Sequence, residues 1–255
     1  MLEIVQLAAL SDNYIYLLHE PASQQTAVVD PAETEPVLAA LAARGWRLTH
    51  VLNTHHHYDH VGGNEALKSA TGCTIVGPAA DRDRIPGIEV ALADGDRFNL
   101  GSAQATVFDV PGHTRGHIAY WFADDQALFC GDTLFALGCG RLFEGTPVQM
   151  WASLSKFRTL PVATRVYCAH EYTQGNARFA LSVEPGNAAL VVRSAEIDRK
   201  RAANQPTVPS TIGEELATNP FLRPDSPEIQ QLLNLRDAPL HEVFGATRAA
   251  KDTFR

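Results

Sequence analysis

Short runs of apolar residues separated by polar breaks dominate the first two thirds of the chain. Runs rich in β-branched and aromatic residues predict strands at 2–7, 14–18, 26–30, 49–53, 73–77, 88–92, 104–110, 117–123, 127–131 and 165–169. Apolar residues at helical spacing predict helices at 35–44, 62–70 and 147–158. We expect the first of these helices to end at Gly45. The pattern therefore predicts a body of mixed strands and helices.

The pattern changes after His170, where strand signals nearly vanish. Helical spacing predicts helices at 187–203, 228–235 and 239–252, joined by proline-rich segments. Mixed strands and helices followed by helices alone predict an α/β (α+β) body with a small helical appendage. We place the boundary after residue 173, which gives expected domains at 1–173 and 174–255.

Composition and charge narrow the class of protein. The chain has 255 residues, of which 45% are hydrophobic and 20% charged, enough for a real core. It has no apolar run long enough to span a bilayer and no signal-peptide pattern at its start. The four cysteines form no CxxC pair, so we expect reduced thiols and a cytoplasmic protein. The net charge of −8 argues against nucleic-acid binding, and a monomer is our default expectation.

The main chemical signal is a histidine-rich segment directly after a predicted strand, with the sequence Thr54-His55-His56-His57-Tyr58-Asp59-His60. Imidazole nitrogen and carboxylate oxygen are good ligands for zinc and similar divalent ions. In an extended segment, positions i and i+2 point to the same side, so His55 and His57 can bind one ion. Asp59 and His60 follow the bend and can reach a second ion. His56 and Tyr58 alternate with these residues and are expected to pack elsewhere.

Three later segments add candidate ligands, each beside small residues at a strand end: His113, Asp132 and His170. Each is weak alone, but together with the first cluster they make seven ligands, the complement of a dinuclear site. Asp132 could bridge the two metals through its two oxygens. We expect His117 to be a buried core histidine. For Asp30, a turn residue and a residue that orients a ligand histidine are equally good interpretations.

These motifs carry a family resemblance that covers essentially the whole chain. The T-H-x-H-x-D-H pattern and the three later ligand segments resemble the metallo-β-lactamase superfamily. More specific segments resemble its hydroxyacylglutathione hydrolase (glyoxalase II) branch: Gly138-Cys139-Gly140-Arg141-Leu142-Phe143-Glu144-Gly145-Thr146, His170-Glu171-Tyr172-Thr173, the stretch from Asn204 to Thr211, Asn219-Pro220-Phe221-Leu222-Arg223, and Arg248-Ala249-Ala250-Lys251-Asp252.

The resemblance implies an αββα sandwich with a C-terminal helical domain and two divalent metal ions per chain. Zinc is the first expectation, with iron and manganese as alternatives. The implied ligands of the first metal are His55, His57 and His113; those of the second are Asp59, His60 and His170; Asp132 bridges. The implied glutathione-binding residues are Arg141, Tyr172, Arg248 and Lys251. The family often has Lys at 141 and Tyr at 143, so Phe143 lacks a hydroxyl that could bind the ligand.

The implied activity is hydrolysis of S-2-hydroxyacylglutathione thioesters, with S-D-lactoylglutathione giving D-lactate and glutathione, the second step of methylglyoxal detoxification. A hydroxide between the metals would attack the carbonyl, with Asp59 orienting it and Asp132 holding both ions. Three alternatives stay open: another hydrolase of the superfamily, such as a lactonase, a β-lactamase-like enzyme or an RNA-processing nuclease; a mononuclear iron persulfide dioxygenase; and a non-catalytic metal-binding protein. The motifs after residue 173 and the complete second ligand set favour the thioesterase, whose preferred acyl group stays open.

Overall fold

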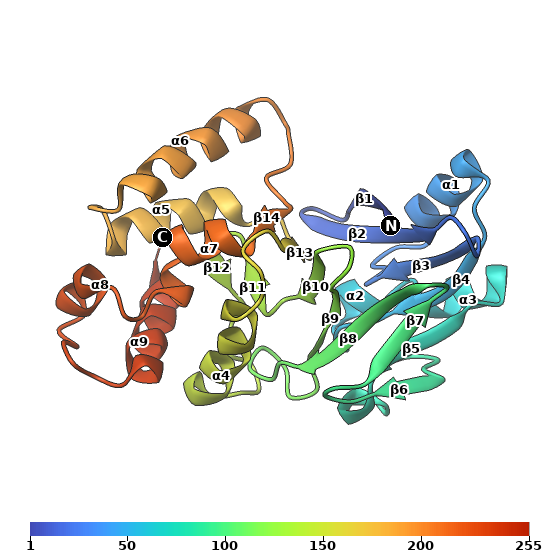
Figure 1. Ribbon diagram of the computed structural model, residues 1–255, viewed down its shortest axis with the longest axis horizontal. Coiled ribbons are helices and arrows are strands. Elements are labelled where there is room, and N and C mark those ends of the chain that lie inside the picture. Colours follow the sequence, from blue (N-terminus) through green and yellow to red (C-terminus); the bar gives the residue numbers. More distant parts are fainter. Residues whose placement is uncertain (255) are drawn as a thin grey trace. The chain divides into compact units, whose positions relative to one another are not determined.

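The computed structural model describes residues 1–254 and divides into two compact units (Figure 1). Unit 1 comprises Met1–Asp109 and Arg115–Gly131, and unit 2 comprises Val110–Thr114 and Asp132–Arg255. These two units are defined by contacts within each of them, and their limits differ from the domain boundary predicted after residue 173. That boundary stays a prediction. No helix within residues 1–254 is both long enough and apolar enough to cross a membrane.

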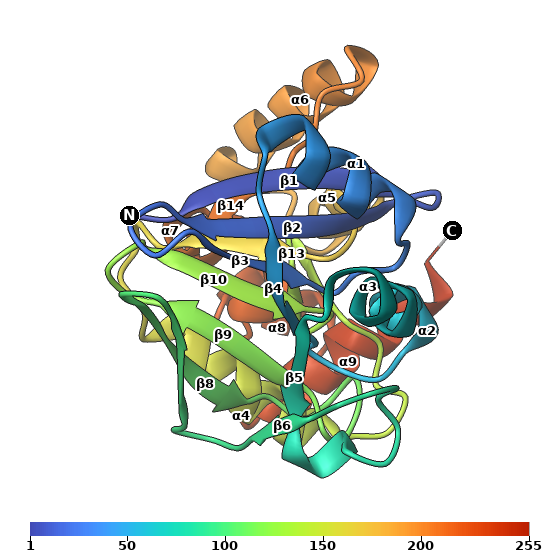
Figure 2. The same cartoon turned by 90° about the vertical axis from the view of Figure 1, so that its right-hand side faces the viewer.

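A six-stranded sheet forms the first layer of unit 1 (Figure 2). Its strands, in spatial order, are β1 (Glu3–Ala9), β2 (Asn13–Glu20), β3 (Gln25–Val29), β4 (Leu48–Leu52), β5 (Thr74–Pro78) and β6 (Val90–Leu92). The first three strands run antiparallel, and the strands from β3 to β6 run parallel. Their carboxyl ends therefore meet at one edge, where the histidine-rich segment leaves β4.

Helices α1 (Glu35–Arg44) and α3 (Asn64–Thr71) cover one face of this sheet. Val37 of α1 and Leu67 of α3 are fully buried with Ile75 of β5 in one apolar cluster. As the sequence predicts, α1 ends before Gly45, whose φ of 67° is left-handed and suits a residue without a side chain. The short helix α2 (Tyr58–Val61) lies between β4 and α3.

An antiparallel meander forms the second layer of unit 1. It consists of β7 (Arg97–Leu100), β8 (Ala103–Asp109), β9 (Ile118–Phe122) and β10 (Ala127–Gly131). Aromatic contacts join the two layers, since Tyr16 of β2 lies 5.6 Å from Phe129 of β10 between ring centroids. β2 is therefore buried along its whole length. β7 is absent from the sequence prediction, although its four residues alternate between exposed and buried positions, because four residues are the shortest alternation that indicates a strand.

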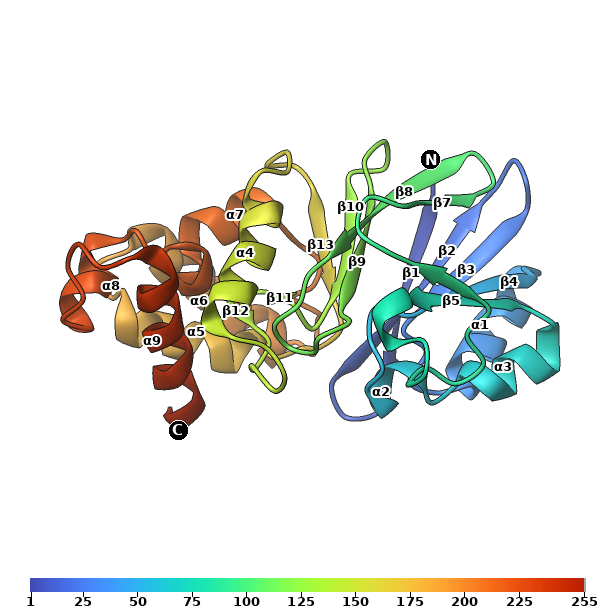
Figure 3. The same cartoon turned by 90° about the horizontal axis from the view of Figure 1, so that it is seen from below.

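Unit 2 is mostly helical (Figure 3). Its helices are α4 (Pro147–Arg158), α5 (Thr173–Val183), α6 (Ala188–Ala202), α7 (Ile212–Thr218), α8 (Pro227–Leu232) and α9 (Leu240–Thr253). Its strands are β11 (Leu134–Phe135), paired with β12 (Gly138–Cys139), and β13 (Arg165–Cys168), paired with β14 (Ser210–Thr211). α4 has the predicted bounds, because Thr146 forms a capping box before Pro147.

Two helices and three short strands in unit 2 lie outside the sequence prediction: α5, α7, β11, β12 and β14. The signal for α7 is present, because Thr211 and Glu214 form a capping box. β14 has only two residues and depends on its pairing with β13. Aromatic packing joins α9 to the rest of the unit, since Phe244 lies 6.2 Å from Trp151 of α4 and 6.1 Å from Phe221.

Candidate metal centre

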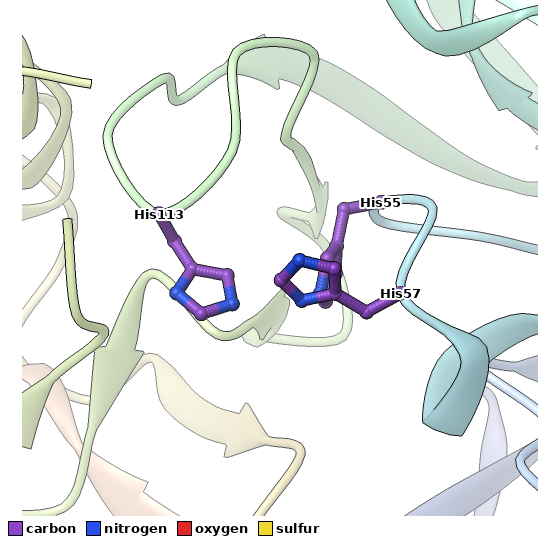
Figure 4. A group of neighbouring side chains, drawn as sticks. All are labelled: His55, His57 and His113. Carbon is purple, nitrogen blue, oxygen red and sulfur yellow. The ribbon is translucent and has the colours of Figure 1, made fainter. Parts of the chain in front are cut away.

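The histidine-rich segment of unit 1 leaves β4 in an extended conformation and turns into α2. His57 occupies the position before the helix with extended backbone angles, and His60 N donates to His57 O at 2.9 Å. The Nε2 atom of His55 lies 3.0 Å from Nδ1 of His57, and Figure 4 shows the two imidazoles side by side. The alternation thus brings His55 and His57 together, but the bend does not keep His60 away from them, since its ring lies 4.0 Å from that of His55 between centroids.

Asp30 orients His60. Its Oδ2 lies 3.0 Å from His60 Nδ1, while Thr54 donates to the same carboxylate through its amide at 2.8 Å and its hydroxyl at 2.7 Å. A carboxylate at Nδ1 accepts the proton of that nitrogen, so Nε2 keeps the lone pair that a metal needs. His60 Nε2 faces Asp59 Oδ2 at 3.6 Å. Of the two interpretations of Asp30, the structure supports the orienting residue.

The other histidines of the segment have different surroundings. His55 Nδ1 lies 3.1 Å from the hydroxyl of Thr54, which leaves Nε2 facing His57. His117 is buried and stacks on His55 with 4.5 Å between ring centroids, and its Nδ1 lies 3.0 Å from Ile118 O, as expected of a core histidine. His56 turns instead to buried Asp81, with Nδ1 3.0 Å from Oδ2.

Unit 2 holds the three remaining candidate ligands, and two of them are histidines that lie beside the carboxylate of the third, Asp132. Asp132 places Oδ2 3.3 Å from His113 Nε2 and Oδ1 3.3 Å from His170 Nε2. His113 lies on the loop after β8 (Figure 4), and its Nδ1 lies 2.9 Å from Arg141 O. That carbonyl can only accept, so Nδ1 carries the proton and Nε2 is the ligand atom.

These distances fit divalent metals. Two ligand atoms that are each ~2.1 Å from a tetrahedral zinc lie about 3.4 Å apart. The 3.3 Å separations in unit 2 match this value, and each oxygen of Asp132 has a histidine of its own, as in a bridging carboxylate. The donors are imidazoles and carboxylates without cysteine, the set typical of a catalytic site rather than of a closed structural zinc site.

Two glycines let the backbone approach these side chains closely. A Cβ on Gly140 would lie 2.0 Å from Asp132 O and 3.0 Å from His113 Nδ1. Gly131 has a φ of 47°, and a Cβ there would lie 2.3 Å from the hydroxyl of Thr54. Side chains at these positions would displace Asp132, His113 or Thr54, so the small residues seen beside the ligands in the sequence have a steric cause.

A group of cationic side chains in unit 2 comes from α5, α9 and the segment after β12. Lys251 is half-buried in α9, and its Nζ lies 3.3 Å from Gly175 O of α5. Partial burial, together with the charges of Arg248, Arg178 and Arg141, lowers the pKa of Lys251 below its usual range. Mutual repulsion of this kind favours an anionic ligand. Arg178 is absent from the residues predicted from the sequence, because no local pattern relates a residue of α5 to one of α9.

Arg248 differs from the exposed residue that a helix near the end of the chain suggests. Only 6% of its surface is exposed, and its guanidinium donates to Cys139 O at 2.8 Å. The same group lies 4.9 Å above the ring of Phe221 and 3.1 Å from the carboxylate of Asp252. Burial raises the pKa of the Cys139 thiol to about 11, although Arg248 opposes this shift. Cys139 is therefore a protonated, buried residue at neutral pH.

Two aromatic rings lie beside the candidate ligands of unit 2. The Tyr172 ring stacks on His170 with 4.7 Å between centroids and 2° between planes, and 41% of its surface is exposed. Phe143 is 62% exposed, and its ring lies 5.1 Å from that of His113. The structure thus places Tyr172 and Phe143 next to His170 and His113. Arg141, whose backbone oxygen contacts His113, belongs with Arg248 and Lys251 to the cationic group.

Comparison with known families divides the chain at residue 170. Residues 11–170 match the metallo-beta-lactamase superfamily, and residues 171–254 match the family described as Hydroxyacylglutathione hydrolase C-terminus. Among curated relatives, a hydroxyacylglutathione hydrolase of Methylococcus capsulatus is 66% identical over 255 residues, with 100% of each chain covered. One of Rhodospirillum rubrum is 56% identical, with 99% of each chain covered.

Solved structures share the fold at lower identity. ETHE1 from Myxococcus xanthus has a TM-score of 0.67 and 26% identity, with 99% of this chain and 100% of that chain covered. TTHA1623, solved in a di-iron-bound form, has a TM-score of 0.61 and 26% identity, with 86% of this chain and 100% of that chain covered. The chain has the mixed α/β metallo-β-lactamase fold with a helical C-terminal region, and it belongs to the hydroxyacylglutathione hydrolase family.

Proposed function

We propose that the protein is a hydroxyacylglutathione hydrolase that hydrolyses S-D-lactoylglutathione to D-lactate and glutathione, the second step of methylglyoxal detoxification. The observation that carries the chemistry is Asp132, which offers one oxygen to His113 and the other to His170, each at 3.3 Å. The names of the relatives and the match of residues 171–254 support the substrate class.

The proposed centre holds two divalent metal ions, with zinc first and iron or manganese as alternatives. Its ligands are His55, His57 and His113 for one ion, Asp59, His60 and His170 for the other, and Asp132 for both. The relative solved in a di-iron-bound form supports the number of ions. When bound, such ions lower the pKa of water from 15.7 to about 7 and polarise a carbonyl group.

Hydrogen bonds within the protein orient the proposed ligands for this chemistry. Asp30 and the Arg141 carbonyl fix the tautomers of His60 and His113, so that both imidazoles present Nε2. In the proposal, the Asp59 carboxylate accepts a hydrogen bond from the attacking oxygen nucleophile and orients that nucleophile toward the thioester carbon. The leaving thiol has an ordinary pKa near 8.5, so it departs as thiolate without a strong acid beside it.

In the proposal, cationic side chains of the protein bind the carboxylates of glutathione. Glutathione carries two carboxylates and one ammonium group, whereas the chain has a net charge of −8, so a local excess of cations is needed. In the proposal, Arg141, Arg178, Arg248 and Lys251 supply it, and they lie in the helical region that we assign to residues 174–255 or beside it. Tyr172 and Phe143 would contact the substrate near the metals. Phe143 has no hydroxyl, so that contact is apolar.

The test is a hydrolysis assay with purified, metal-loaded protein and four substrates: S-D-lactoylglutathione, a penicillin-type lactam, a lactone, and glutathione persulfide with oxygen uptake as its readout. We expect kcat/KM for the glutathione thioester to exceed kcat/KM for each of the other three substrates by at least about 100-fold. We also expect this activity to increase as the metal content rises to two ions per chain. Faster turnover of the lactam or lactone, or oxygen uptake with one iron per chain, would contradict the proposal.

A second comparison isolates the cationic group. The S-D-lactoyl thioester of N-acetylcysteamine keeps the reacting atoms but lacks the carboxylates of glutathione. We expect KM to rise strongly for this substrate while the chemistry persists, because only remote binding is lost. We further propose that the protein acts as a monomer in the cytoplasm, which light scattering of the purified chain and cell fractionation can test.

A further inference from the structure

Asn13 contacts the same aspartate twice. It begins β2, is 6% exposed, and its Nδ2 lies 3.1 Å from the backbone oxygen of Asp59 and 3.1 Å from Oδ2 of the Asp59 side chain. An amide nitrogen carries two hydrogens, so it can donate to both oxygens at once. Both atoms belong to unit 1, and Asn13 lies 46 residues before Asp59 in the sequence.

This double contact fixes the side chain relative to its own backbone. Asp59 lies in α2, which has only four residues, and 36% of its side chain is exposed. Such a side chain would otherwise move among several rotamers. Because one amide donates to both the backbone oxygen and Oδ2, it restricts the orientation of the carboxylate. Carboxylates that bind metals are commonly held by hydrogen bonds of this kind.

A purely structural role is the competing explanation, in which Asn13 only ties β2 to α2. The backbone of Asn13 is already set by its pairing with Ala9 in the β1–β2 ladder, so β2 does not need the amide group. A tie between the two elements would also need only the bond to the backbone oxygen. The bond to Oδ2 is the additional feature, and it acts on the proposed metal ligand itself.

We propose that Asn13 is a positioning residue that holds the Asp59 carboxylate in the orientation needed to bind the second metal. This inference rests on the proposed dinuclear function. Loss of such a hydrogen bond typically weakens metal affinity by about 10- to 100-fold. The first ion, assigned to His55, His57 and His113, should bind nearly as before, because the Asn13 amide donates to Asp59, a proposed ligand of the second ion.

The experiment compares the wild type with Asn13→Leu, which keeps similar volume without the donor, and with Asn13→Ala. Apo protein is titrated with Co²⁺ in competition with a chelator, and bound metal is measured after equilibrium dialysis. The melting temperature of each apo and loaded protein is recorded. Asn187→Ala is the matched control, since it removes an amide that caps α6 and contacts no proposed ligand.

We expect each Asn13 variant to bind its second Co²⁺ about 10- to 100-fold more weakly and to lose part of the metal-dependent rise in melting temperature. The apo melting temperature should change no more than in Asn187→Ala. Wild-type affinity for both ions in either Asn13 variant would overturn the inference. So would a large fall in apo melting temperature with equal loss of both ions. A wild type that binds one ion contradicts the proposed function itself.

Discussion

Replacing Arg248 with alanine should impair both the stability of the protein and substrate binding. The side chain is 6% exposed and contacts three groups: Cys139 O at 2.8 Å, the ring of Phe221 at 4.9 Å, and the carboxylate of Asp252 at 3.1 Å. Its position in the cationic group also makes it a proposed contact for a glutathione carboxylate. The two roles predict separate changes that separate measurements can detect.

The stability change can be worked from these contacts. A hydrogen bond from a charged donor contributes about 1.5–3 kcal/mol, and a buried cation–π contact contributes about 1–2 kcal/mol. The pair with Asp252 adds little, because that carboxylate is 43% exposed. The sum is about 2.5–5 kcal/mol. At about 2–4 °C per kcal/mol for a chain of this size, the melting temperature should fall by roughly 5–20 °C.

The assay combines calorimetry with steady-state kinetics on S-D-lactoylglutathione. We expect KM to rise about 10-fold, equivalent to about 1.4 kcal/mol, with a smaller change in kcat, since the contact is remote from the reacting carbonyl. Arg141→Ala is the control, because that side chain is 66% exposed and its ion pair with Asp252 is long at 3.8 Å. It should raise KM with almost no change in melting temperature.

Two results would refute this reasoning. If Arg248→Ala melts within about 2 °C of the wild type, the buried contacts do not stabilise the protein as their geometry indicates. If the variant loses kcat and keeps KM, Arg248 acts on the reaction itself rather than on a remote carboxylate. Arg248→Lys distinguishes charge from shape, because lysine keeps the charge but loses the planar group above Phe221.

Two further predictions concern buried carboxylates. Asp30→Asn puts an amide donor against either Thr54 or His60, so metal affinity should fall about 10- to 100-fold by equilibrium dialysis; unchanged metal content would show that Asp30 does not orient His60. Burial raises the pKa of Glu184, but hydrogen bonds from Arg223, Asn187 and Ser226 outweigh it and lower the pKa below 4.5. The charged form therefore stabilises the fold above pH 4.5, and this contribution is lost as pH falls through the lower, folded value. Glu184→Gln should be less stable than the wild type at pH 7 and should lose less stability on acidification. Urea unfolding at several pH values measures both effects, and parallel plots of unfolding free energy against pH for the two proteins would contradict this.

The sequence by itself determined those elements whose signals are local. Helix α4 has the predicted bounds because Thr146 and Pro147 specify its start, and α1 ends before Gly45 because that position has a left-handed φ. The arrangement of the four candidate ligands within the histidine-rich segment also depends on local signals. Alternation along an extended segment brings His55 and His57 together. The turn into α2 then returns the His60 ring to within 4.0 Å of that of His55 between centroids.

Tertiary structure alone decided the contacts between segments distant in the sequence. Asn13 reaches Asp59 across 46 residues, and Arg248 reaches Cys139 across 109. β14 has two residues and exists as a strand only through β13, and Arg178 joins Lys251 only because α5 packs near α9. Periodicity and capping act over one or two turns of chain, whereas these contacts depend on how whole elements pack, and no local pattern encodes that.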